Sequence, residues 1–153
     1  MQNMLKFGLK TLFLLVVLLG VGAIYSIDQS QTYGRLINYV GIVRGATQRL
    51  VKLELAQEPH DDLIAYLDGI QDELRTGEGP YGLIRPDDLE YNNNLSQLQR
   101  LWGTLKEDIL AARQDKTASA ALLRASEDYF DLANKTVFAA ESFAHKKPPC
   151  SCA

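Results

Sequence analysis

The hydrophobic residues of this chain form one dense block near the N-terminus and four spaced stripes after it. The block covers residues 9–27, LKTLFLLVVLLGVGAIYSI, in which Lys10 is the only charged residue. Its 19 residues come close to the roughly 20 that an α-helix needs to cross a bilayer. Lys10 lies near one end, where its side chain can extend to the headgroups. The block therefore predicts a transmembrane helix over residues 9–27.

The charges that flank this block predict its orientation. Lys6 and Lys10 lie on the N-terminal side, and the first acidic residue is Asp28. By the positive-inside tendency, residues 1–8 stay in the cytoplasm and the chain after Asp28 is extracytoplasmic, on a single-pass protein of the inner or cell membrane. A cleaved signal peptide is the alternative, since residues 21–23, VGA, resemble a cleavage site. The block continues to Ile27, which favours an uncleaved anchor.

Beyond the block, apolar residues recur at alternating three- and four-residue steps, which is the pattern of amphipathic helices. The first stripe consists of Leu36, Tyr39, Val43, Ala46, Leu50 and Leu53. The second consists of Leu63, Leu67, Ile70 and Leu74. The third consists of Tyr91, Leu95, Leu98, Trp102, Leu105, Ile109 and Ala112, and the fourth of Leu122, Ala125, Tyr129, Leu132, Thr136, Ala139 and Phe143. No segment has a convincing strand pattern.

Turn-forming and capping residues place the ends of these helices. The first helix is expected to stop near Pro59, and the second ends at Gly77, before a loop over residues 76–86 that holds three glycines and two prolines. Asp87 is expected to cap the third helix in a capping box with Glu90. The fourth helix runs from about Thr117 to His145. Together these features predict an all-α, up-down antiparallel four-helix bundle over residues 28–147.

The C-terminal residues 148–153, PPCSCA, do not fit this bundle. Two prolines stop a helix, and in a transmembrane receptor a second span would follow here. The tail is too short and too polar to cross a membrane, so we expect a truncated or non-native end. The only cysteines, Cys150 and Cys152, lie in this tail and cannot cross-link the body, which excludes a disulfide framework.

Composition and motifs exclude several functions. A net charge of −3 with no basic cluster argues against nucleic acid as a partner. The chain has no nucleophile–base pair, glycine-rich phosphate loop or zinc spacing, so we expect no enzyme activity, cofactor or metal site. His60 and His145 are expected to be exposed and Trp102 to pack in the core. The acids of residues 71–74, QDEL, and residues 106–110, KEDIL, are expected on solvated helix faces.

The stretch INYVGIVRGATQRLV, residues 37–51, adds a second seam to the first helix, formed by Ile37, Gly41, Arg44, Gln48, Val51 and Leu55. Gly41 and Gly45 form a small-xxx-small pair that lets another helix approach closely. In a parallel homodimer two Arg44 guanidinium groups would face each other, and a bound anion would relieve their repulsion. The alternative is that Arg44, Gln48 and Lys52 form a solvated helix face.

The same stretch resembles the conserved box in the first periplasmic helix of nitrate- and nitrite-responsive sensor kinases and of the type IV pilus class of methyl-accepting transducers. Similar helical modules also precede diguanylate cyclase domains. The matching residues are Ile37, Asn38, Gly41, Arg44, Arg49 and Leu50. The resemblance implies that Arg44 contacts an anion from both subunits across a dimer axis. Gly45, Ala46 and Thr47 depart from the box, and the match covers 15 of 153 residues.

The sequence therefore predicts an extracytoplasmic sensor module of a bacterial signalling receptor, either a chemoreceptor, a histidine kinase of a two-component system or a diguanylate cyclase. It would dimerise through its first helix and bind a small anion. The expected ligand-binding residues are Arg44, Asn38, Gly41, Gly45 and Gln48. The competing hypothesis is a membrane-anchored helical bundle that binds another protein and no small molecule.

Overall fold

The computed structural model describes the backbone of residues 2–146 and the side chains of residues 7–115 and 117–146. Within this part of the chain all regular structure is helical, which confirms the expected all-α class. The elements are α1 (Gln2–Leu55), α2 (Asp61–Thr76), α3 (Leu89–Gln114), the short 3-10 turn η1 (Lys116–Ala118) and α4 (Ser119–Lys146). The expectations for the tail, residues 148–153, lie outside the described residues.

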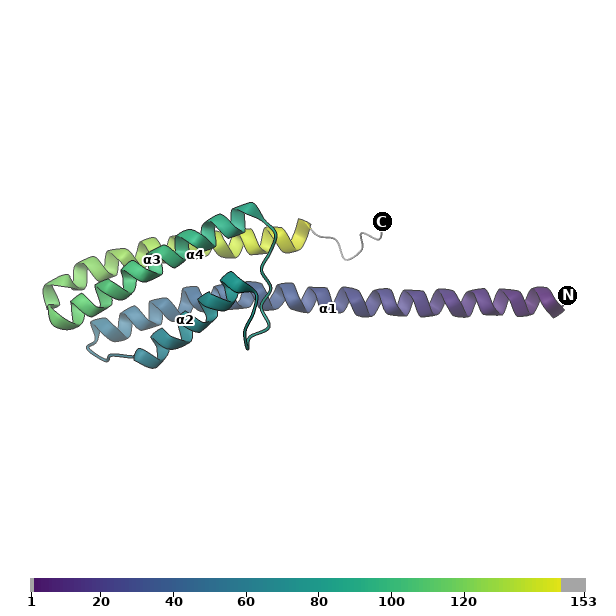
Figure 1. Ribbon diagram of the computed structural model, residues 1–153, viewed down its shortest axis with the longest axis horizontal. Helices are drawn as coiled ribbons and strands as arrows, with labels where there is room; N and C mark the ends of the chain where they lie inside the picture. Colours follow the sequence, from purple (N-terminus) through teal and green to yellow (C-terminus); the bar gives the residue numbers. More distant parts are fainter. Residues whose placement is uncertain (1, 147–153) are drawn as a thin grey trace.

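The four α-helices pack side by side with alternating chain direction (Figure 1). The C-terminal half of α1 belongs to this helical bundle, whereas its N-terminal half projects from one end alone (Figure 1). Within the bundle, α4 lies along both α1 and α3 and packs closely against each of them. The helix α2 is shorter and packs mainly against α1.

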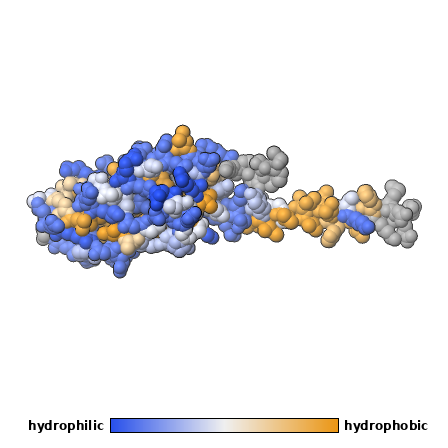
Figure 2. All heavy atoms as spheres, in the orientation of Figure 1, coloured by the Kyte–Doolittle hydropathy of each residue, from blue (hydrophilic) through white to orange (hydrophobic). Residues whose placement is uncertain are grey.

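The projecting half of α1 carries the apolar block. Its large hydrophobic side chains are exposed, including Phe13 at 71% and Ile24 at 70%, and they form the hydrophobic arm of Figure 2. By length and composition this is the one helix in the described chain that can cross a membrane, although a signal sequence has the same features. None of its most apolar 18-residue window is buried in the protein, unlike the core helix of a soluble protein.

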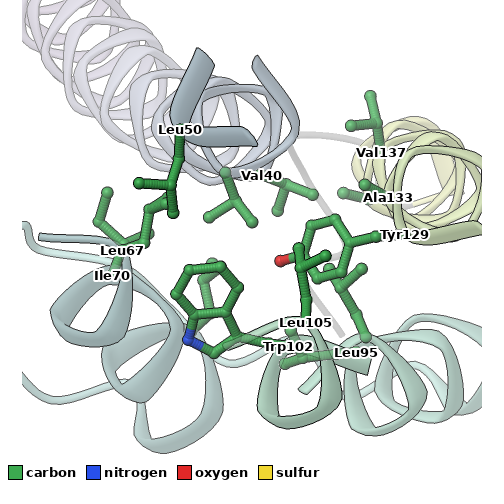
Figure 3. Packing of buried hydrophobic residues seen from close by; sticks show 14 of the residues in the cluster. Val40, Leu50, Leu67, Ile70, Leu95, Trp102, Leu105, Tyr129, Ala133 and Val137 are labelled. Carbon is green, nitrogen blue, oxygen red and sulfur yellow. The ribbon is translucent and has the colours of Figure 1, made fainter. Parts of the chain in front are cut away.

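The hydrophobic core lies between the four helices of the bundle (Figure 3). The stripe of α3 is buried as predicted from Tyr91 to Ile109, and α2 and α4 also turn their predicted faces inward. On α1 the core face is rotated, because Val40, Thr47 and Val51 are buried while Tyr39, Ala46 and Leu53 are only half-buried. The rotation follows from the close packing of α4 on this side of α1.

The indole of Trp102 packs against Tyr129 with ring centroids 6.1 Å apart, which confirms its place in the core. Its Nε1 donates a hydrogen bond of 2.6 Å to Asp68 Oδ1 on α2. Lys106 Nζ also lies 2.7 Å from this oxygen. The contact of α2 with α3 is therefore partly polar.

The helix ends agree with the sequence expectations in part. Gly77 ends α2 in the left-handed conformation at φ 76°, and its N–H donates to Glu73 O at 2.7 Å. The expected capping box at Asp87 is wrong by one residue. Asp88 is the cap, and its Oδ1 accepts from Tyr91 N at 2.9 Å, so Glu90 is not at the position that completes the box.

The connection between α2 and α3 is held by a buried carboxylate, contrary to the expectation that the acids of residues 71–74 are all solvated. Glu73 is 1% exposed, and its two oxygens accept the backbone N–H groups of Tyr81 at 2.8 Å and Leu83 at 2.7 Å. These bonds satisfy loop amides that would otherwise be buried without partners. Glu73 lies on the inner side of α2, beside Leu74.

A second buried carboxylate fastens the end of the bundle that lies away from the apolar arm. The side chain of Glu54, 1% exposed, receives two hydrogen bonds from Arg113, at 2.8 Å from Nε and 2.6 Å from Nη2. Arg113 also contacts Asp61 at 2.8 Å. These hydrogen bonds raise the pKa of Arg113 above its usual range. The cluster therefore joins the end of α1, the start of α2 and the end of α3.

We predict that Arg113→Met destabilises the protein by about 3 kcal/mol, because it leaves the Glu54 charge buried without a cation. The double variant Glu54→Leu with Arg113→Met should recover most of this loss, since no charge then remains buried. Chemical denaturation of the full chain in detergent, followed by circular dichroism, measures both. A double variant as unstable as the single one would contradict this account.

The phenol of Tyr91 is a buried polar group in the core. Its Oη has no hydrogen-bond partner among the described side chains, and burial raises the pKa of Tyr91 above its usual range. The native state thus keeps this proton to higher pH than the unfolded state, whose tyrosines titrate near pH 10. The contribution of Tyr91 to stability is therefore constant below about pH 10 and falls as the pH rises further.

We predict that Tyr91→Phe changes the free energy of unfolding by less than about 1 kcal/mol at pH 7, because the lost hydroxyl makes no hydrogen bond. Above pH 10 the wild type loses stability through Tyr91 and the variant does not. The difference in free energy of unfolding between the two proteins should therefore shift in favour of the variant. Denaturation curves at pH 7 and pH 11 test the prediction. The same difference between variant and wild type at both values would refute it.

Candidate functional site

Arg44, the central residue of the predicted site, lies on the side of α1 that faces α4. Its Nη1 donates a hydrogen bond of 2.7 Å to Asn134 Oδ1, and its guanidinium carbon lies 5.8 Å from the centre of the Phe130 ring. The side chain is half-buried. Two residues of α4 therefore hold the position of this cation.

The rest of the second seam follows the same side of α1. Gln48 Nε2 donates to Ser126 O on α4 at 2.9 Å, and Val51 is 1% exposed. We expected this seam at the interface between two copies of the chain. In the single chain the part of the seam from Arg44 to Val51 lies against α4, whereas Ile37 and Gly41 are half-buried at the edge of this contact.

An open groove runs between α1 and α4 on the outer surface of the bundle. Its α1 wall consists of Ile37, Asn38, Gly41, Ile42 and Arg44. Its α4 wall consists of Asn134, Val137, Phe138 and Glu141. The structure thus brings together three predicted site residues, Arg44, Asn38 and Gly41, in one groove. Gln48 lies beyond the groove, where its amide is bound to α4.

Gly45 lies beside the groove, on the exposed outer face of α1. A Cβ atom added at Gly34, Gly41 or Gly45 would meet no atom within 4 Å apart from the adjoining backbone of α1. These three glycines are spaced by seven and four residues, so they lie on one face of the helix. We call this surface the glycine face of α1. Gly41 is half-buried at the edge of the groove, whereas Gly34 and Gly45 are exposed.

The electrostatics of the groove are set by two opposite charges. Apart from its bond to Asn134, the Arg44 guanidinium has no acceptor among the described residues, and within the same set Glu141 has no cation within ion-pair distance. The guanidinium can donate several hydrogen bonds to a carboxylate or an oxyanion. The groove can therefore bind a ligand that carries an anionic group.

The predicted stripes do not contain the residues of the α4 wall of this groove. Asn134, Phe138 and Glu141 are not members of the predicted core stripe, and nothing in their spacing pairs them with Arg44. An exposed phenylalanine among polar residues was the available signal, since Phe138 interrupts the polar face of α4 and is 65% exposed.

Comparisons of the chain with protein families, with curated proteins and with solved structures found no match. The resemblance of residues 37–51 to the sensor box therefore remains an expectation from the sequence. The geometry of the groove between α1 and α4 is the evidence for a site.

Proposed function

We propose that this chain is the extracytoplasmic sensing module of a membrane-anchored signalling receptor, and that it binds a small ligand through an anionic group at Arg44. The observation that carries the proposal is a half-buried guanidinium that lines a groove and has no carboxylate partner in the described chain. The apolar arm of α1 supports a membrane anchor. Lys6 and Lys10 support a cytoplasmic N-terminus.

The chemistry of Arg44 suits an anionic group. Its guanidinium is always charged and presents donors in a fixed fork, which matches the oxygens of a carboxylate or an oxyanion. The hydrogen bond to Asn134 and the contact with the Phe130 ring already hold the guanidinium in place before a ligand binds. Little side-chain entropy is therefore lost on binding. Partial burial strengthens the attraction by reducing the screening of water.

The proposed signal depends on a parallel homodimer that packs through the glycine face of α1. Gly34, Gly41 and Gly45 allow two backbones to approach closely, and each Arg44 then lies next to the partner helix. A ligand that favours one packing of these helices shifts the equilibrium toward it. Because α1 continues from the bundle into the apolar arm, a change in its packing reaches the membrane.

We predict that a small anion stabilises the full chain in detergent micelles against heat. At 100 times the dissociation constant, the gain in free energy of unfolding is about 2.7 kcal/mol. Nitrate, nitrite, acetate and longer carboxylates are the probes. Arg44→Gln should abolish the effect, whereas Arg100→Gln on the exposed face of α3 should retain it. If no anion stabilises the wild type, the anchored protein-binding bundle becomes the better hypothesis.

We also predict that a cysteine on the glycine face forms a disulfide between two copies. Gly45→Cys is made in full chain that carries Cys150→Ser and Cys152→Ser, with Glu107→Cys on α3 as the control. A symmetric parallel dimer places both copies of residue 45 near its axis, so mild oxidation should cross-link this variant much faster than the control. Equal rates for the two variants would exclude dimerisation through this face.

A further inference from the structure

We infer that the ligand of the groove between α1 and α4 is an elongated zwitterion, with a carboxylate at one end and a primary ammonium group at the other. This inference rests on the proposed function and extends it from the anionic group at Arg44 to the whole ligand. It is carried by the second charge of the groove, Glu141, which a simple anion would leave unused.

The two charges lie at opposite ends of the groove. Arg44 is bound to Asn134, whereas Glu141 lies seven positions further along α4. Seven residues span roughly 10 Å of helix axis, so Asn134 and Glu141 share one face of α4 two turns apart. No ion pair joins Arg44 to Glu141, since neither belongs to any of the salt bridges found among the described side chains.

The inner side of the section between the charges is apolar, and the exposed residue Asn38 adds a polar group on α1. Ile37 and Val137 form its inner part, and Gly41 leaves space because it has no side chain. Phe138 stands on the outer edge and is 65% exposed. A chain of methylene groups could lie along this section and cover part of the phenylalanine ring, which removes apolar surface from water.

These features define the length of the ligand. A carboxylate at Arg44 and an ammonium group at Glu141 must be separated by several methylene groups to reach both partners. An α-amino acid carries both charged groups on the same carbon atom and can satisfy only one end of the groove. Medium-length ω-amino acids have the required form, so 6-aminohexanoate is the first probe and hexanoate is its match without the ammonium group.

Isothermal titration calorimetry of the full chain in detergent micelles tests the inference. We expect the affinity for 6-aminohexanoate to be at least about tenfold higher than that for hexanoate, because one charge-assisted hydrogen bond is added. Glycine, a short zwitterion, should bind no better than acetate. Glu141→Gln should lower the affinity for 6-aminohexanoate to that for hexanoate and leave the affinity for hexanoate unchanged.

Two further variants separate the possible failures. Arg44→Gln should abolish binding of both compounds, and Glu127→Gln, at an exposed position on α4, should change neither. If hexanoate binds as tightly as 6-aminohexanoate and Glu141→Gln has no effect, the zwitterion is wrong while the anion site at Arg44 stands. If the wild type binds no compound that carries an anionic group, the proposed function itself fails.

Discussion

The packing of α4 along α1 determines both the core and the candidate site. Buried residues of the two helices, among them Val43, Leu50 and Ala133, exclude water from the inner side of this contact. On its outer side the two helices form the groove that holds Arg44 and Glu141. Because Asn134 and Ser126 accept hydrogen bonds from the polar residues of the α1 seam, close packing does not leave those residues without partners.

Two buried carboxylates hold the less regular parts of the bundle. Glu73 binds the loop that connects α2 to α3, and a Cβ atom added at Gly79 in this loop would overlap its carboxylate. Glu54 joins three helix ends through Arg113. A buried carboxylate is favourable only where hydrogen bonds or a cation compensate its lost hydration. Glu54 is compensated by Arg113, 59 positions away in the sequence, whereas Glu73 is compensated by the loop that directly follows its own helix.

The sequence predicted the features that depend on local rules. The stripe on α3 and the end of α2 at Gly77 follow from helix periodicity and capping. The partner of the α1 seam could not be predicted, because periodicity shows that Arg44 borders an interface without showing which helix covers it. The burial of Glu73 could not be predicted for a related reason. It depends on the backbone N–H groups of Tyr81 and Leu83 in the loop, which helix periodicity does not place beside Glu73.

The unbroken course of α1 has a mechanical meaning. Its 54 residues contain no proline, so at 1.5 Å per residue it is a rod of roughly 80 Å. Each residue turns such a rod by about 100°. The angular position of the glycine face is therefore locked to that of the side chains in the apolar arm, and inserting one residue between them would put the two ends out of phase. The helix can transmit rotation as well as displacement along its axis.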